Sequence, residues 1–159
     1  IKKILMIKIN VFVSNKSWRK HIKNPDIYLK KKVTLLNKKN NFFKNRDVSF
    51  SLLLSGNKEI KIINKKFRKK NNSTDVLSFP FYEKKKVKKL LKKKSNFYLG
   101  DVIVNLNKII NCSTDKDLIK KFHQLWLHGF VHLLGYSHQS KKDYLEMKRV
   151  EDKLFKLIT

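Results

Sequence analysis

Segments with alternating apolar residues and segments with helical spacing follow one another along the 159 residues of this chain. Alternation with a period of two is typical of a strand with one buried face, and apolar residues three or four apart indicate an amphipathic helix. The order is strand, helix, strand, helix, two strands and two helices. It predicts an α/β (α+β) fold, in which helices pack on a mixed four-stranded sheet, most simply in three layers. The expected strands cover residues 7–13, 48–54, 75–81 and 99–106, and the expected helices cover residues 25–36, 60–67, 115–134 and 141–158.

The length and composition suit one domain over residues 1–159, since 41% hydrophobic residues can form a core and no repeat or Pro/Gly-rich linker divides the chain. No apolar run approaches the roughly 20 residues that span a bilayer. Cys112 is the single cysteine, which excludes an internal disulfide and fits a reducing compartment. Residues 1–5 are too short for a signal peptide, and we expect the natural start near Met6. These features predict a cytoplasmic protein that is not embedded in a membrane.

Positive charge dominates the chain, with 39 Lys and Arg against 12 Asp and Glu and a formal net charge of +27. Such a field attracts polyanions, so nucleic acid and anionic membranes are the expected classes of partner. Only four of the 39 are arginine, and the abundance of lysine, asparagine and isoleucine is typical of an A/T-rich genome. The charge therefore supports nucleic-acid binding without establishing it.

A lysine-rich run lies at residues 83–96 between the last two expected strands. We expect a solvated loop there, because blocks of like charge repel one another. A phosphate-gripping flap is the functional alternative. A membrane-surface helix is a third, with Val87, Leu90 and Leu91 as its apolar anchors.

Three of the five histidines fall within eleven residues, at a spacing that suits metal ligands. On a helix, His128 and His132 lie about 40° apart and can bind one ion. Gly135 ends the helix, and the following residues can return His138 to the same point. Three neutral imidazoles with an open fourth position are the usual arrangement of catalytic zinc, so we expect one Zn²⁺ per chain.

The remaining candidates have simpler interpretations. His123 lies about 140° around the helix from His128, and His21 stands alone, so both are expected to be structural or exposed. Cys112 is expected to act as a small apolar residue. Zinc peptidases with the His-Glu-x-x-His motif carry a glutamate general base where this chain has Gly129, which disfavours a protease.

Three blocks of the sequence resemble the YbeY endoribonuclease (rRNA maturation factor) family. Residues 128–138 are similar to its His-Gly-x-x-His-Leu-x-Gly-Tyr-x-His signature. Residues 64–68 (Asn-Lys-Lys-Phe-Arg) and 73–80 (Ser-Thr-Asp-Val-Leu-Ser-Phe-Pro) resemble its second block, and residues 99–104 resemble its Leu-Gly-Asp-Ile strand. The blocks occur in the family order, and with their flanking elements they cover the chain from Met6 to the C-terminus.

The resemblance implies a single-domain metalloprotein with a zincin-like metal helix. It would act in the cytoplasm on ribosomal RNA, in maturation of the 3′ end of the small-subunit RNA and in ribosome quality control. It assigns His128, His132 and His138 as zinc ligands and Arg68 as the arginine of the active cleft. Ser137 stands where the family usually has aspartate. If that aspartate orients a ligand, its absence is expected to weaken metal binding on the order of 10–100-fold.

The chemistry can also be argued from the residues. A three-histidine zinc lowers the pKa of a bound water to about 7 and polarises a phosphoryl oxygen. The planar guanidinium of Arg68 can hold two phosphate oxygens, so Arg68 and His128 are the expected catalytic residues. Asp75 and Asp101 are carboxylates near the relevant strands, and the sequence does not identify a general acid or base.

Three hypotheses follow. The first is a single-strand-specific endoribonuclease that acts on ribosomal RNA of the small ribosomal subunit. The second is a non-catalytic RNA-binding assembly factor with a structural zinc, and the third is a metal-dependent hydrolase of another substrate, including peptides. An open metal position separates the first from the second, and Gly129 together with the charge separates the first from the third.

Overall fold

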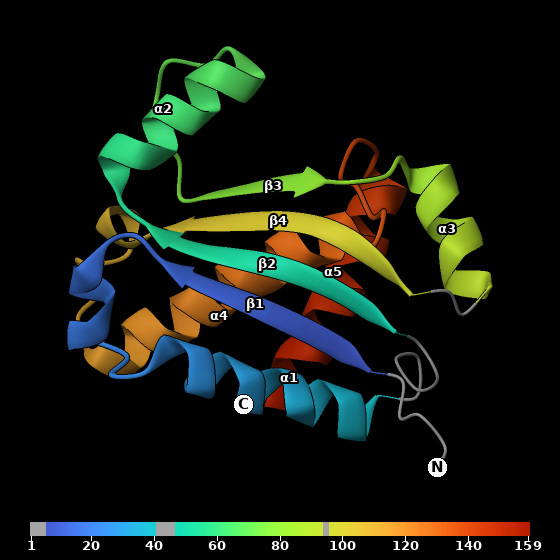
Figure 1. The fold of residues 1–159 in the computed structure, drawn as a ribbon, viewed down its shortest axis with the longest axis horizontal. Helices are drawn as coiled ribbons and strands as arrows, with labels where there is room; N and C mark the ends of the chain where they lie inside the picture. The colour runs from blue at the N-terminus through green and yellow to red at the C-terminus, as the bar shows by residue number, and fades with distance from the viewer. Residues whose placement is uncertain (1–5, 41–46, 94–95) are drawn as a thin grey trace.

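Four strands form one mixed sheet in the computed structural model, which describes residues 6–40, 47–93 and 96–159 (Figure 1). The strands lie in the order β1-β2-β4-β3. β2 pairs in parallel with β1 and with β4, whereas β3 pairs antiparallel with β4. The predicted mixed four-stranded sheet is therefore confirmed, and β3 is an edge strand that ends at Pro80. The bounds are Ile7–Val13 for β1, Val48–Ser55 for β2, Val76–Pro80 for β3 and Phe97–Asn105 for β4.

Helices cover both faces of the sheet, as the predicted three layers require (Figure 1). On one face α1 (Pro25–Lys39) contacts β1, α4 (Asp115–Leu133) contacts β3 and β4, and α5 (Lys141–Ile158) packs against α1 and α4. On the other face lies α2 (Asn57–Arg68). Short 3₁₀ turns at Lys16–Lys20 and Leu106–Lys108 complete the connections.

Two hydrophobic clusters hold these layers together. The larger lies between the sheet and the α1, α4 and α5 layer, where Phe50 contacts the rings of Trp126 and Phe130. The smaller joins Ile60 of α2 to Leu77 and Ile103 of the sheet. Burial of these apolar surfaces is the main source of stability for such a fold. The two predicted caps also form: the hydroxyl oxygens of Thr114 and Ser140 accept backbone N–H bonds three residues later, both at 3.1 Å.

The lysine-rich run differs from its prediction. The solvated loop expected at 83–96 is wrong, because Lys84–Lys92 form the helix α3; residues 94 and 95 lie outside the described part of the chain. Val87 and Leu91 stand one turn apart and are buried in the larger cluster, with Leu90 partly buried beside them. Burial of this stripe fixes the helix, while the lysines point to solvent and their repulsion is screened there.

Close packing of α4 on the sheet accounts for the glycine between two of the histidines. A Cβ on Gly129 would lie 2.5 Å from Cγ1 of Val102 on β4, a distance that real side chains do not tolerate. Glycine at this position therefore allows α4 to approach the sheet closely. A side chain at position 129 would point towards Val102 of β4.

The expected start near Met6 concerns residues 1–5, which lie outside the described residues. Among residues 6–40, 47–93 and 96–159, no helix combines the length and the apolar character needed to cross a bilayer.

Candidate active site

The three predicted ligands come together at the C-terminal end of α4. His128 and His132 face each other across one helical turn, with 3.1 Å between their Nε2 atoms. Gly135 adopts a positive φ of 96°, a conformation that glycine allows and that turns the chain back towards the helix. His138 follows this turn, and each of the three residues offers a ring nitrogen within 4.8 Å of the others. The group could hold a metal ion.

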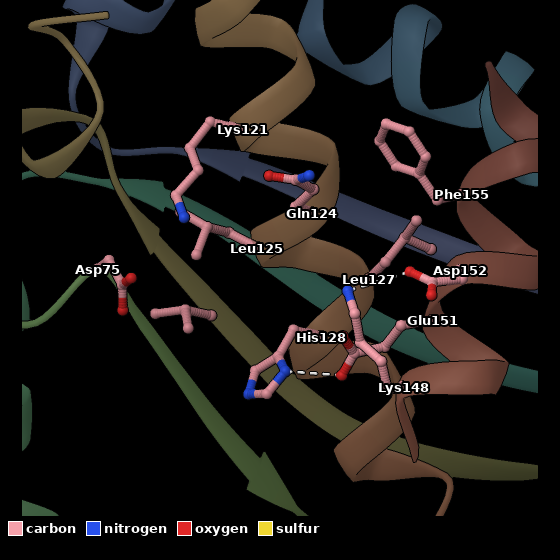
Figure 2. A pocket seen from close by; sticks show the side chains of 11 residues that line it. Asp75, Lys121, Gln124, Leu125, Leu127, His128, Lys148, Glu151, Asp152 and Phe155 are labelled. Atoms are coloured by element: carbon pink, nitrogen blue, oxygen red, sulfur yellow. Dashed lines mark hydrogen bonds and ion pairs between the residues drawn. The ribbon is translucent and has the colours of Figure 1, made fainter. Parts of the chain in front are cut away.

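Two further contacts orient the imidazoles. Nδ1 of His128 lies 2.7 Å from Oε1 of Glu151 on α5 (Figure 2), and Nδ1 of His132 lies 3.0 Å from the carbonyl oxygen of Tyr136. Because both partners are acceptors, each Nδ1 carries the proton, and each Nε2 presents a lone pair to the site. Carboxylate and carbonyl partners of this kind are what metal-binding histidines usually have.

The donor set fits zinc. Zinc–nitrogen bonds of about 2.0–2.1 Å at tetrahedral angles place two ligand nitrogens about 3.3 Å apart, close to the observed 3.1 Å. Burial lowers the pKa of His132 below that of free histidine, and charge on His128 or His138 would lower it further, although the bond to Tyr136 opposes this. His132 is therefore neutral at pH 7, the form that binds a metal.

Glu151 is a residue that sequence reasoning missed. It lies 23 residues from His128 on a different helix, and its side chain is only 17% exposed. The available signal was its place beside the apolar stripe of α5, next to Val150 and three residues before Leu154. An acidic side chain at such a boundary usually has a partner.

Ser137, which stands where the family usually has aspartate, lines the cleft between Tyr136 and His138. In the described structure the acceptors that orient His128 and His132 come instead from Glu151 and Tyr136. The expected loss of metal affinity at Ser137 stays a prediction.

The histidines open into a cleft of about 900 Å³, and Arg68 is among the residues that line it. Arg68 is the last residue of α2, and its Nη2 donates a 2.7 Å hydrogen bond to the carbonyl oxygen of Ser78 on the edge strand β3. Its guanidinium carbon lies 5.4 Å from the centre of the Phe79 ring. These contacts hold a charged arginine in the wall of the cleft.

The two candidate carboxylates lie in different places. Asp75 lines the cleft and also a cavity of about 350 Å³ beyond His128, between α4 and α5 (Figure 2). Asp101 lies on the α2 side of the sheet, where its carboxylate accepts a hydrogen bond from the Tyr98 hydroxyl. Burial and the contact with this carboxylate raise the pKa of Tyr98 to about 12. The structure thus places Asp75, and not Asp101, beside the histidines.

The residues expected to be structural are away from the cleft. His123 is buried and its Nδ1 accepts a 2.9 Å hydrogen bond from the indole of Trp126, so its Nε2 carries the proton and donates to the Tyr28 hydroxyl at 2.8 Å. Burial lowers the pKa of His123 to about 4. The structural prediction for His123 is confirmed. His21 is partly buried beside Asp115, and Cys112 is partly buried against the larger core cluster.

Comparisons with known proteins identify the family of the chain. The family model described as Endoribonuclease YbeY matches residues 12–159. A relative from Pelagibacter ubique with that name is 40% identical over 156 residues, covering 96% of this chain and 97% of the relative. Another from Ehrlichia canis is 31% identical over 151 residues, covering 94% and 90%. The fold resembles the solution structure of a protein from Thermotoga maritima, with a TM-score of 0.52, 24% identity and coverage of 95% and 89%. The chain belongs to the YbeY family of endoribonucleases.

Proposed function

We propose that this chain is a zinc-dependent endoribonuclease that cleaves single-stranded ribosomal RNA. The observation that carries the proposal is the three-histidine group at the floor of an open cleft with Arg68 in its wall. A metal site that is closed on all sides serves structure, whereas a site that opens to a substrate-sized cleft is suited to catalysis. His138 is exposed in this cleft, which leaves room for a phosphodiester beside the ligands.

Each ligand has a defined task in this proposal. His128, His132 and His138 would hold the ion through their ring nitrogens, and Glu151 and the Tyr136 carbonyl keep the first two rings oriented. When bound, a zinc ion supplies Lewis acidity and activates water for hydrolysis at neutral pH.

Arg68 would bind the phosphate that is cleaved. Arginine carries five N–H donors in a planar fork, and the Ser78 carbonyl accepts only one hydrogen bond from it. The remaining donors can contact two non-bridging oxygens, whose negative charge grows in the transition state. Asp75, Glu83 and Asp143 are the acidic residues that line the cleft, and Asp75 also lines the cavity beside His128, so we propose Asp75 as the proton acceptor.

The choice of ribosomal RNA rests on the resemblance to the family and on the net charge of +27. We propose maturation of the 3′ end of the small-subunit RNA and ribosome quality control as the biological role, with the small ribosomal subunit as partner and the cytoplasm as location. A strongly basic protein binds RNA through its phosphates, so this binding will weaken as salt rises.

The alternatives are less well supported. A structural zinc in an RNA-binding assembly factor does not require a cleft beside the ligands. For a peptidase, the position of the glutamate base is occupied by Gly129, which faces Val102 of β4 and has no room for a side chain.

The test combines metal analysis with RNA cleavage. Purified wild type is expected to contain about one zinc per chain and to cleave a single-stranded RNA from the 3′ region of small-subunit RNA. His128→Ala should lose both properties, whereas the matched control His21→Ala, which removes a histidine outside the cleft, should keep both. A metal-free wild type that cleaves at the full rate, or a zinc-loaded wild type that cleaves no RNA, would overturn the proposal.

A further inference from the structure

A basic helix and an exposed aromatic ring adjoin the metal cleft, and the proposed mechanism uses neither. The helix is α3, and the ring is that of Phe81, between the end of β3 and the start of α3. In Figure 1, α3 stands at the end of β3, beside the segment that follows α4.

The position of α3 relative to the histidines is fixed. Val87 is fully buried and Leu91 is 8% exposed, so one face of the helix is part of the larger core cluster. A Cβ on Gly135 would lie 3.3 Å from Cγ of Lys84, so the first turn of α3 lies against the turn that leads to His138. Lys84 also lines the same cleft as the three histidines. The lysines of α3 are therefore presented at a defined place beside the site.

The charge of α3 exceeds that of the acidic side chains beside it, which are Glu83 at its N-terminus and Glu146 in the cavity that Lys84, Lys88 and Lys92 line. Six of its nine residues are lysines, all exposed, and none forms an ion pair within the described residues. Like charges on one helix destabilise it, and a polyanion would relieve that repulsion. The lysines at positions 84, 88 and 92 recur every four residues, so they form a row along one side of the helix.

Phe81 supplies a different kind of contact. Its residue surface is 65% exposed, although large aromatic side chains are usually buried. Edge-on contacts with Tyr82 and Tyr98, at centroid distances of 4.9 and 6.0 Å, hold the orientation of the ring. Phe81 and Tyr82 both line the cleft. An oriented, exposed ring at the mouth of a cleft can stack on a flat ligand.

We propose that Phe81 and the row Lys84, Lys88 and Lys92 form the surface that leads single-stranded RNA into the metal cleft. One base stacks on Phe81, and phosphates of the same strand contact the lysine row. Stacking on aromatic rings combined with backbone contacts to basic residues is how proteins bind single strands, whose bases are free to leave the stack. The bases of a duplex are not accessible in this way.

A membrane fits this surface less well. The apolar residues of α3 are Val87, Leu90 and Leu91, and they face the protein core. An interfacial helix needs such residues on its outer face. RNA requires only the charge and the ring that are exposed.

The inference deepens the proposed function and is tested by binding, separately from cleavage. The probe is a fluorescein-labelled 12-nucleotide single-stranded RNA, titrated with wild-type protein at several salt concentrations, and its integrity is checked after each titration. Phe81→Leu should weaken binding about 10-fold through the loss of one stacked base, and Phe81→Trp should restore it. Phe12→Leu is the matched control, since Phe12 is 56% exposed on β1 at the opposite edge of the sheet.

The lysine row has its own readout. The double change Lys84→Gln and Lys88→Gln should reduce the slope of log affinity against log salt by about 1.4 units, from about 0.7 per phosphate contact on a single strand. The same change at Lys31 and Lys38, which are exposed lysines of α1, should reduce the slope less than the change at Lys84 and Lys88 does. Phe81→Leu should leave the slope unchanged.

Three results would refute this surface as an RNA-binding site. Phe81→Leu could bind RNA as tightly as wild type, or an RNA duplex could bind as tightly as the single strand. In the third, variants of α3 lose binding to anionic vesicles but keep their affinity for RNA. A wild type that shows the expected binding pattern without cleaving RNA would refute the proposed function and leave this surface standing. If wild type cleaves RNA and Phe81→Leu binds RNA as tightly as wild type, the surface is refuted and the proposed function is kept.

Discussion

Substitution of Glu151 tests whether its hydrogen bond to His128 strengthens metal binding at the proposed site. The Oε1–Nδ1 distance of 2.7 Å and the small exposure of Glu151 indicate a hydrogen bond that water competes for weakly. Removing such a partner of a metal-binding histidine typically costs 10–100-fold in metal affinity, or about 1.4–2.8 kcal/mol. We expect Glu151→Ala to fall in this range. Glu151→Gln should lose less, because its amide oxygen can still accept the Nδ1 proton while the negative charge is gone.

Zinc affinity, measured by competition with a chromophoric chelator, separates this role from a purely structural one. Asp152→Asn is the matched control, since Asp152 is the next residue on α5 and pairs with Lys148 at 3.0 Å. The control should bind zinc as wild type does. Urea unfolding of the metal-free proteins shows how much Glu151 contributes to the fold alone. Equal zinc affinity in wild type and Glu151→Ala would refute the reasoning.

Three further changes test other parts of the structure. Arg68→Lys should keep the zinc content and most of the RNA affinity but reduce the single-turnover cleavage rate on the order of 10²-fold, because lysine cannot bind two phosphate oxygens in one plane. An unchanged rate would show that Arg68 has no part in the mechanism. Gly129→Ala should lower the free energy of unfolding in urea by about 1–3 kcal/mol through its clash with Val102, and Val102→Ala in the same chain should recover part of the loss; additive losses would contradict this packing. His123 has a pKa of about 4 in the folded state and about 6.5 in the unfolded state. Below pH 6.5 the unfolded state therefore binds more protons, and the free energy of unfolding decreases as the pH is lowered. Between pH 7.5 and 5 the metal-free wild type should therefore lose about 2 kcal/mol of stability relative to His123→Gln, whereas a pH-independent difference would refute the burial of a neutral imidazole.

Much of the fold could be predicted because it follows from local patterns. The alternation in β1 and β2 and the caps at Thr114 and Ser140 depend on residues close in sequence. The histidine group was also predictable, since a helical turn and a glycine bring His128, His132 and His138 together within eleven residues.

What the sequence did not reveal depends on contacts between distant segments. The carboxylate of Glu151 reaches His128 only because α5 packs on α4. For α3, the charge pattern favoured a solvated loop, yet two buried apolar residues one turn apart outweighed the repulsion among exposed lysines. Likewise, Asp75 and Asp101 both lie in sequence near strands that adjoin the candidate site. Only the arrangement of the sheet shows that Asp75 lines the metal cleft, whereas Asp101 lies on the α2 side.

In the proposed function, one metal ion held by His128, His132 and His138 is required for RNA cleavage. The most direct measurement is the single-turnover cleavage rate of metal-free protein as zinc is added in sub-stoichiometric steps. We expect the rate to rise linearly and to stop rising at about one zinc per chain, and we expect no rise for His132→Ala at any ratio. Full cleavage without added metal, or a rise in His132→Ala that matches wild type, would contradict it.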